Sequence, residues 1–441
     1  MGLGKTLVAL SLIMSGNHFP NLIICNKSLL TSISNDTRKF FGDVPFFVLH
    51  NDAMKLEMDN LNASWFERHK FILTTYDVLV VLGKRAGILG RRPLDNKKDA
   101  GTNFFSMKFH RVICDESQRF VNPKSQVFRC LQNVKCDYRL CLTGTPIRNY
   151  DYDLHTQLVF CGLDQSVKWS KSTYTELDLR QSIHSVSMIE ANISLPEKKV
   201  IQLDLNFTET EAGIYRAVYN NSVDTFKSFN SGKTNFASVL LQFLRLRQVC
   251  IAPWMINDKR DIDVDLDRIK HGYCSTKILR TIQIVNEIPG NEKVIIFSSF
   301  TSALTLIQEA LKYHLNLEHE VVMIHGGTSV KKREILFERF RKLQTVRVLL
   351  ITNNVGCMGL NLTEANHVIL IETWWNDTVG DQAAARAWRI GQTKKVFIWR
   401  LIVNKSIEQR MIQMCQSKNT MTDDYLKEGP SRETILALFE K

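Results

Sequence analysis

Short apolar runs alternate with longer segments in which apolar residues recur at helical spacing. The runs in the first third of the chain predict strands at Leu22–Cys25, Phe71–Thr75, Arg111–Cys114 and Tyr138–Leu142. A second series predicts strands at Val294–Phe297, Val321–Ile324, Val346–Ile351, His367–Ile371 and Val396–Ile402. Because strands that alternate with helices are typical of parallel sheets with helices on both faces, two such series predict two α/β lobes.

The stretch between the two series, roughly residues 150–275, has a mostly helical pattern. Phe236–Val249 carries apolar residues at helical spacing and includes Arg245 and Arg247. No repeat with a fixed period is visible, which argues against a solenoid. Within the first series, Lys84–Lys98 predicts a basic surface loop, with a nucleic-acid contact as the alternative interpretation.

Composition narrows the class of protein. The 441 residues are 44% hydrophobic and carry a net charge of +12, which indicates a folded protein that binds a polyanion such as nucleic acid or an acidic membrane surface. No apolar run reaches the roughly 18 residues of a membrane span. The ten cysteines form no CxxC pair, so we expect buried thiols in a reducing compartment, with neither structural zinc nor a disulfide scaffold.

The amino-terminal segment MGLGKTLVALSLIMSG has three interpretations. Gly-Lys-Thr before an apolar helix matches the second half of a P-loop, in which Lys5 would bind the β- and γ-phosphates and Thr6 would bind Mg²⁺. The same residues fit a short signal peptide, and Gly2 with Thr6 fits a loose myristoylation pattern. The rest of the chain has to decide among them.

A carboxylate pair in RVICDESQ supplies what a P-loop needs from a second strand. Asp115 and Glu116 directly follow the predicted strand Arg111–Cys114. Asp115 would hold Mg²⁺ and Glu116 would polarise the attacking water. The alternative is a surface pair at a strand end, which is common in α/β proteins. About thirty residues later, LCLTGTP places hydroxyl groups after the next strand, where they could sense the γ-phosphate.

The order of these motifs resembles the SWI/SNF-like DNA-translocating ATPases of helicase superfamily two. MGLGKT, LIICNKSLL, FILTTYD, ICDESQ and LTGTPIRN follow the order of that family, and LRLRQVC resembles its helix between the lobes. In the second half, KVIIFSSF, IHGGTS, GLNLTEANHVILIETWWN and QAAARAWRIGQ match as well. The chain departs from the family pattern at Asn26, Gln118, Gly380 and Ala385. It resembles compact viral members of the baculovirus global transactivator type.

The resemblance implies two RecA-like P-loop NTPase lobes with a helical insertion. We expect an ATP-binding lobe at 1–160, a helical region at 161–275, a second RecA-like lobe at 276–430 and a tail at 431–441. The first lobe would be incomplete at its amino end, without the strand and the loop residues that normally precede Met1. The true start would then lie upstream, or the enzyme would be weak.

The resemblance also implies the residues of the site. Catalysis would use Lys5, Asp115, Glu116 and the arginine fingers Arg386 and Arg389 of the RAWRIGQ helix, which share a helix face at i and i+3. The nucleotide would be bound by Gly2, Leu3, Gly4, Lys5, Thr6, Gln118, Gly359 and Gln382, with Mg²⁺ on Thr6 and Asp115. Nucleic acid would contact Lys27, Ser28, Thr74, Thr75, Ser298, Ser299, Gly326 and Thr352.

The function that these expectations describe is ATP-dependent movement along double-stranded DNA, with ATP hydrolysed between the lobes. Such a motor would remodel chromatin or a DNA-bound protein in transcription or repair, in the nucleus or, for a viral protein, in the host nucleus. The main alternative is a DNA-binding regulator that has lost catalysis. A GTPase or a small-molecule kinase is excluded, since neither needs the RAWRIGQ segment.

Overall fold

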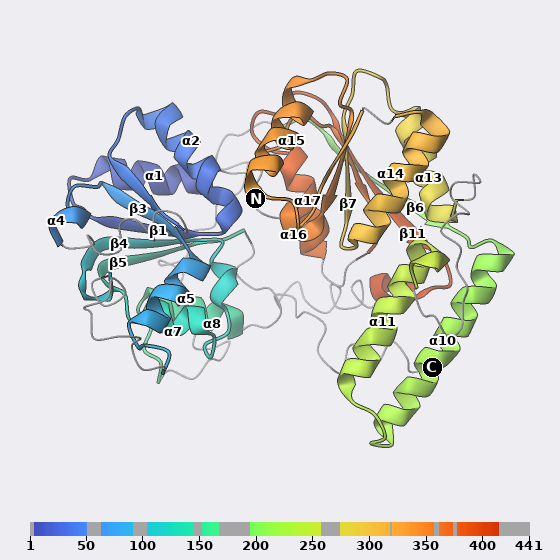
Figure 1. The fold of residues 1–441 in the computed structure, drawn as a ribbon, viewed down its shortest axis with the longest axis horizontal. Coiled ribbons are helices and arrows are strands. Elements are labelled where there is room, and N and C mark those ends of the chain that lie inside the picture. The colour runs from blue at the N-terminus through green and yellow to red at the C-terminus, as the bar shows by residue number, and fades with distance from the viewer. Residues whose placement is uncertain are drawn as a thin grey trace. The chain divides into compact units, whose positions relative to one another are not determined.

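The computed structural model describes residues 4–50, 63–90, 104–144, 152–166, 195–256, 274–317, 320–356, 361–373 and 377–413. They form two compact units, one mainly within Leu3–Ile193 and the other mainly within Ser194–Tyr425. Each unit is built on its own parallel sheet (Figure 1).

The first unit alternates strands and helices along the chain. Its elements are α1 (Lys5–Ser15), β1 (Asn21–Cys25), η1 (Lys27–Leu29), α2 (Leu30–Phe41), β2 (Phe46–Leu49), α4 (Ala63–Phe66), β3 (Phe71–Thr75), α5 (Tyr76–Arg85), β4 (Lys108–Asp115), η3 (Ser117–Phe120), α7 (Gln126–Gln132), β5 (Lys135–Leu142) and α8 (Tyr152–Cys161). The five strands have the order β2-β3-β1-β4-β5 and all pairs are parallel.

Alternate residues of the central strand β1 enter two different cores. Leu22 and Ile24 pack with the helices α5, α7 and α8 on one face of the sheet, and Ile23 and Cys25 pack with α1 and α2 on the other (Figure 1). Every residue of β1 is buried. A strand that is covered on both faces reads as a continuous apolar run, which is why the sequence pattern identifies it.

The second unit repeats this arrangement and adds a helical hairpin. Its elements are β6 (Lys198–Leu205), α10 (Glu209–Asn230), α11 (Phe236–Ile251), η5 (Pro253–Met255), α13 (Thr276–Glu287), β7 (Val294–Ser298), α14 (Thr301–Leu315), β8 (Val321–Ile324), α15 (Val330–Lys342), β9 (Val348–Thr352), α16 (Asn353–Gly356), β10 (His367–Leu370), α17 (Asp377–Ala387) and β11 (Val396–Val403). Its six parallel strands have the order β6-β11-β10-β7-β9-β8.

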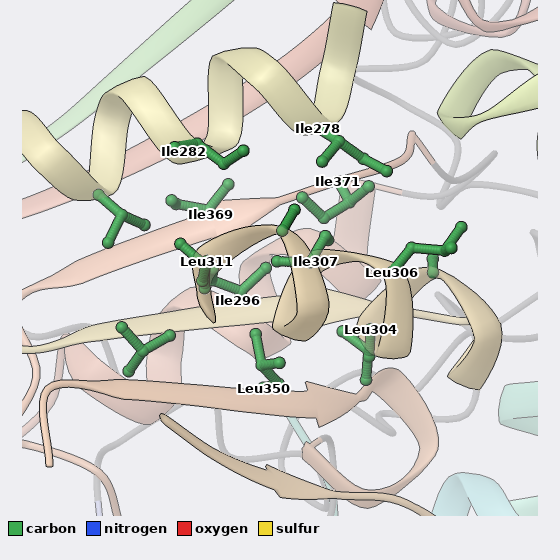
Figure 2. Close-up of a cluster of buried hydrophobic side chains, with 14 of the residues drawn as sticks. Ile278, Ile282, Ile296, Leu304, Leu306, Ile307, Leu311, Leu350, Ile369 and Ile371 are labelled. Atoms are coloured by element: carbon green, nitrogen blue, oxygen red, sulfur yellow. The ribbon is translucent and has the colours of Figure 1, made fainter. Parts of the chain in front are cut away.

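Helices cover both faces of the second sheet too. Figure 2 shows one of the two cores, in which Ile278 of α13 and Ile307 of α14 lie against Ile296 of β7 and Ile369 of β10. On the opposite face, α15, α16 and α17 bury a separate cluster that includes Phe297 of β7. The two cores hold the sheet from both sides and leave its strand ends available for polar residues.

All nine predicted strands are present, and the described part of the chain contains two further strands that were not predicted. The unpredicted strand β2 is a half-buried FFVL run at one sheet edge. The other, β6, lies in the stretch that the pattern assigned to helices, yet it pairs along its full length with β11. As an edge strand it alternates exposed and partly buried positions and begins with two lysines, so its apolar signal is weak.

The predicted helix at Phe236–Val249 is confirmed as α11, which forms a hairpin with α10. The side chain of Glu211 in α10 is buried and accepts hydrogen bonds from the backbone N–H of Thr276 at 2.9 Å and from its hydroxyl at 2.5 Å. Thr208 and Glu211 also form a capping box at the start of α10. The hairpin is therefore attached to the start of α13 by a buried carboxylate.

The described residues contain neither a candidate membrane span nor a candidate metal cluster. None of the described helices is long and apolar enough to cross a membrane. In the same part of the chain, no three His, Cys, Asp or Glu side chains are grouped so that they could hold a metal ion.

Candidate active site

Polar residues gather where the parallel strands of the first sheet end. Lys27 follows β1, Thr75 ends β3, Asp115 ends β4 and Thr143 follows β5. Because the strands are parallel, these residues lie along one edge of the sheet. The carboxyl edge of a parallel sheet is where α/β proteins usually bind ligands.

The structure brings the GKT and DESQ motifs into direct contact. Helix α1 begins at Lys5 after Gly4, whose φ of 72° lies in the left-handed region that favours glycine. In its first turn, the Thr6 hydroxyl donates a hydrogen bond of 2.9 Å to Oδ2 of Asp115. The other carboxylate oxygen, Oδ1, accepts from the backbone N–H of Glu116 at 3.0 Å. Two motifs that lie 109 residues apart therefore form one site.

Asp115 has an unusual acidity for a carboxyl group. Its side chain is 3% exposed, and burial together with the charge of Glu116 raises its pKa to about 6. The hydrogen bond from Thr6 and the positive charge of Lys5 oppose this rise. A bound cation stabilises the ionised form of such a buried carboxylate, because it compensates for the hydration that burial removes.

A chain of side-chain hydrogen bonds leads from Glu116 to the next strand. Glu116 has a left-handed backbone with φ of 54°, and its Oε2 accepts from Nε2 of Gln118 at 2.6 Å. Oε1 of Gln118 in turn accepts from the Thr143 hydroxyl at 2.7 Å. Gln118 thus fixes the orientation of the Glu116 carboxylate and connects it to Thr143 of the TGTP segment.

Three buried residues that were not predicted from the sequence form hydrogen bonds beneath the surface of this edge. The Tyr76 hydroxyl donates to the backbone carbonyl of Asp115 at 2.8 Å, and the Ser117 hydroxyl donates to Oε1 of Gln157 at 2.6 Å. All three side chains are buried. Ser117 belongs to the DESQ motif and Tyr76 to TTYD. Their positions next to predicted site residues were the feature of the sequence from which their supporting role could have been predicted.

The donor set of this site fits a magnesium ion. The Thr6 hydroxyl and the Asp115 carboxylate are hard oxygen ligands in contact with each other, and Mg²⁺ is usually held by one or two such groups together with phosphate oxygens and water. Lys5 and the N-terminus of α1 lie beside them, and a helix N-terminus favours anions such as phosphate.

The predicted nucleic-acid residues of the first lobe differ in accessibility. Lys27 is exposed at the start of η1, and the side chain of Ser28 lies outside the described part of the structure. Thr74 and Thr75 are buried: the Thr74 hydroxyl donates to the carbonyl of Leu49, and that of Thr75 caps α5. A phosphate contact at the two threonines would have to use backbone groups.

The carboxyl edge of the second sheet is organised around Glu372, a residue not singled out from the sequence. Its carboxylate accepts a hydrogen bond from the Ser298 hydroxyl at 2.9 Å and another from the backbone N–H of Ser299. The Ser299 hydroxyl accepts from Nδ2 of Asn353 at 2.9 Å. Ser298 has no exposed surface, so its hydroxyl stabilises the lobe through the bond to Glu372 and is not accessible to a ligand.

The two remaining nucleic-acid candidates lie at the same edge. Thr352 ends β9 in register with Ser298 of β7, and it is 6% exposed. Gly326 follows β8 and is exposed. Of the second-lobe candidates, Gly326 and the partly exposed Ser299 are the accessible ones.

A buried arginine, Arg247 of α11, completes the surroundings of Glu372. It lies 5.3 Å from the ring centre of Phe300. Burial lowers the pKa of Arg247, and the charges of Glu372 and Glu408 act against that shift. Glu408 itself pairs with Lys277 at 2.6 Å, and both side chains are almost completely buried. The LRLRQVC helix therefore contributes charge to the interior of the second lobe.

The predicted arginine fingers do not share one helix. Arg386 lies in the last turn of α17 and is 6% exposed, but the helix ends at Ala387 and Arg389 follows in a turn. The expected i and i+3 geometry on a helix face is therefore wrong. The turn is held by Gln392, whose Nε2 donates to three backbone carbonyls including that of Ala387, and by Gly391 with φ of 101°.

The other predicted nucleotide-binding residues can be placed only in part. Gln382 lies in α17 and is partly exposed. Gly2, Leu3 and Gly359 lie outside the described residues.

Comparison with known proteins places both units in one family. Residues 1–255 match the SNF2-related domain, and residues 276–391 match the helicase conserved C-terminal domain. The chain is 31% identical to "Putative helicase 172L" of Invertebrate iridescent virus 6, over 98% of this chain and 84% of that protein. It is 26% identical to "Probable global transactivator" of Orgyia pseudotsugata multicapsid polyhedrosis virus, over 93% and 82%.

A cellular relative is similar at a lower coverage. "ATP-dependent DNA helicase DDM1" of Arabidopsis thaliana is 26% identical over 95% of this chain and 57% of that protein. The matched ranges include all five strands of the first sheet, the Thr6–Asp115 site and every strand of the second sheet except β11. The chain therefore belongs to the SNF2 family of helicase-like ATPases, with two RecA-like lobes.

Proposed function

We propose that this chain is an ATP-driven translocase on double-stranded DNA that remodels protein–DNA complexes. The observation that carries the proposal is the contact of Thr6 with Asp115 at the carboxyl edge of the first sheet, with Glu116 held beside it. In a member of the SNF2 family, this arrangement supports hydrolysis of ATP.

The residues of the first lobe have distinct roles in this proposal. Lys5 and the first turn of α1 bind the β- and γ-phosphates, and Thr6 and Asp115 hold Mg²⁺, which neutralises charge on the phosphates when bound. Glu116 orients the attacking water and accepts its proton. Gln118 keeps the Glu116 carboxylate in position and connects it to Thr143, so a change in Glu116 on hydrolysis would reach the strand end of β5.

The second lobe supplies the remaining charge. We assign Arg386 and Arg389 as arginine fingers that stabilise the γ-phosphate in the transition state. A guanidinium group from a second lobe makes hydrolysis depend on the arrangement of the two lobes, which is how nucleotide turnover can drive movement. Gln382 and Gly359 would contact the same nucleotide.

Duplex DNA is the proposed track. The charge of +12 and the similarity to DDM1, which is named an ATP-dependent DNA helicase, support nucleic acid as the partner. The accessible candidates Lys27, Ser299 and Gly326 would bind backbone phosphates, so binding should be independent of sequence and should weaken with salt by about 0.9 log unit per neutralised phosphate for each tenfold rise in salt. Action on chromatin would place the protein in a nucleus, or in the host nucleus for a viral protein.

The deciding experiment measures ATP hydrolysis with and without duplex DNA, together with displacement of a third strand from a DNA triplex. We expect DNA-stimulated hydrolysis and ATP-dependent displacement for the parent, and loss of both for Lys5→Ala. Lys124→Ala, an exposed lysine of the same lobe, is the matched control and should behave like the parent.

Two results would contradict the proposal. A parent protein that binds DNA but hydrolyses no ATP at saturating DNA would support the regulator alternative. Hydrolysis without triplex displacement would leave a DNA-stimulated ATPase that does not translocate.

A further inference from the structure

Two cysteines of the first lobe lie in contact with each other. Cys141, near the end of β5, and Cys161, the last residue of α8, have sulfur atoms 3.7 Å apart. A disulfide bond has an S–S length of about 2.05 Å, so the sulfurs would have to approach by roughly 1.7 Å. They lie twenty residues apart in the chain.

The two thiols differ in access and in acidity. Cys161 is exposed, whereas Cys141 is only partly so. The hydrogen bond between the thiols lowers the pKa of Cys161, with a further contribution from the positive charge of Arg139, and it raises the pKa of Cys141. An exposed thiol with a lowered pKa next to a second thiol is the arrangement of redox-sensitive cysteine pairs.

We propose that Cys141 and Cys161 are an oxidation site that a peroxide converts to a disulfide. Cys161 gives up its thiol proton and the thiolate attacks one peroxide oxygen: an S–O bond forms, the O–O bond breaks, and the hydroxide that leaves takes up the proton as water, so Cys161 becomes a sulfenic acid. The Cys141 thiol then attacks that sulfur: the S–S bond forms, the S–O bond breaks, and the hydroxyl leaves with the Cys141 proton as a second water. Two thiols and one peroxide thus give one disulfide and two waters, and a thiol reductant reverses the change.

The disulfide would connect two elements that support the Glu116 segment. Helix α8 carries Gln157, which accepts from Ser117, and Cys141 lies two residues before Thr143, which donates to Gln118. A covalent bond between α8 and β5 would therefore restrict both hydrogen-bonded contacts to the DESQ segment. On the proposed function, oxidation should lower kcat for ATP, by roughly 5-fold or more if the coupling is of ordinary size.

The other thiols of the lobe serve as internal comparisons. Cys114 lies beside Cys141 in register but has no exposed surface, so a peroxide cannot reach it in the folded protein. Cys136 is partly exposed on the same strand as Cys141, and burial raises its pKa, so it should react slowly. Cys136→Ser is therefore the matched control variant.

The test treats the full chain with graded hydrogen peroxide, blocks the remaining thiols and maps the peptides by mass spectrometry without reduction. We expect a linked pair of peptides containing Cys141 and Cys161 that lacks two hydrogen atoms and disappears with dithiothreitol. Neither Cys141→Ser nor Cys161→Ser should give this product, and Cys136→Ser should give it like the parent. In parallel, kcat should fall on oxidation and recover on reduction in the parent and in Cys136→Ser.

The peptide map does not depend on catalysis, so it can fail separately from the proposed function. Sulfinic or sulfonic acid on Cys161 without a link to Cys141 would overturn the proposal. So would a Cys161 that reacts no faster than Cys136. A disulfide that forms but leaves kcat unchanged would overturn the proposed effect on turnover.

Discussion

The carboxyl edges of the two sheets have the same architecture, but they differ in whether the polar groups at the strand ends are already bonded within the lobe. At the first edge, Asp115 is bonded to the Thr6 hydroxyl, and both groups could also bind a metal ion. Glu116 is bonded to Gln118 and remains partly exposed. At the second edge, the carboxylate of Glu372 accepts hydrogen bonds from the Ser298 hydroxyl and the Ser299 N–H, so these two donors already have a partner within the lobe. A strand-end position alone therefore does not make a ligand site: the neighbours decide whether the polar groups are available.

The largest effect is expected at Arg389, which follows the end of α17 in the second unit. Arg389→Ala should lower kcat on the order of 10³-fold at saturating DNA, with ATP affinity almost unchanged, because a finger acts on charge that develops in the transition state. Arg389→Lys should not restore turnover, since a point charge does not replace the planar guanidinium. Steady-state kinetics at saturating DNA measures this.

A different result for Arg389→Ala would change the comparison. Normal kcat together with weaker DNA binding and a shallower salt dependence would make Arg389 a phosphate contact. All the chemistry would then belong to the first edge.

The closed state of the second edge can be tested through Glu372. Glu372→Leu should lower the free energy of unfolding of the second unit by about 1–3 kcal/mol for each buried donor that loses its acceptor, here the Ser298 hydroxyl and the Ser299 N–H. Hydrogen exchange of the β7 and β10 amides measures the loss in that unit alone. Glu334→Leu, an exposed glutamate of α15, should have little effect.

An unchanged exchange pattern with markedly tighter DNA binding would mean that Glu372 competes with DNA. The second edge would then be a regulated ligand site, and the contrast with the first edge would disappear.

The open first edge depends on the hydrogen bonds of Gln118. Gln118→Ala removes the bonds to Glu116 and Thr143 and should lower kcat by roughly 10- to 100-fold, as expected for hydrogen bonds to a charged group. The KM for ATP should change little. Gln132→Ala changes an exposed glutamine of the same lobe and is the control. Equal kcat values for the two variants would show that Glu116 needs no such support.

The smallest effect concerns the acidity of Asp115. Its pKa of about 6 is raised, so the carboxylate is protonated at pH values at which an ordinary aspartate is ionised. Mg²⁺ needs the ionised form, so its apparent affinity should be constant above pH 7 and should fall by about tenfold per pH unit below 6. Magnesium activation curves between pH 5 and 8 measure this, and an affinity that is still constant at pH 5 would contradict it.

Sequence pattern was sufficient for features that depend on local signals. Strands covered on both faces, such as Asn21–Cys25, read as apolar runs, and the motif order led to the contact of Thr6 with Asp115. It was insufficient where pairing across the chain decides the outcome. The edge strand β6 is stabilised by β11, and the pair of Lys277 with Glu408 joins residues 131 positions apart.

At the end of α17 the sequence carries two opposing local signals, one for a longer helix and one for its end. The alanine-rich run predicts a helix that continues through Arg389, whereas Gly391 with its positive φ marks an approaching stop. The amide of Gln392 bonds to the carbonyl of Ala387, among others, and so satisfies a group that a further helical turn would have used. The same amide also donates to the carbonyls of Thr363 and Ala365, and these tertiary contacts fix the turn in which Arg389 lies beyond the end of the helix.

The pairing of β6 with β11 also has a consequence for folding during synthesis on the ribosome. The hydrogen bond between Asn206 and Asn404, at the end of these strands, spans 198 residues. At a synthesis rate of about 5–20 residues per second, β6 is made roughly 10–40 s before its partner strand. During that interval its backbone has no β11 to pair with, although its lysines and alternating exposed positions discourage contact with other chains. The lysines and exposed positions that weaken the apolar signal of β6 are thus also features that discourage edge-to-edge pairing before β11 is made.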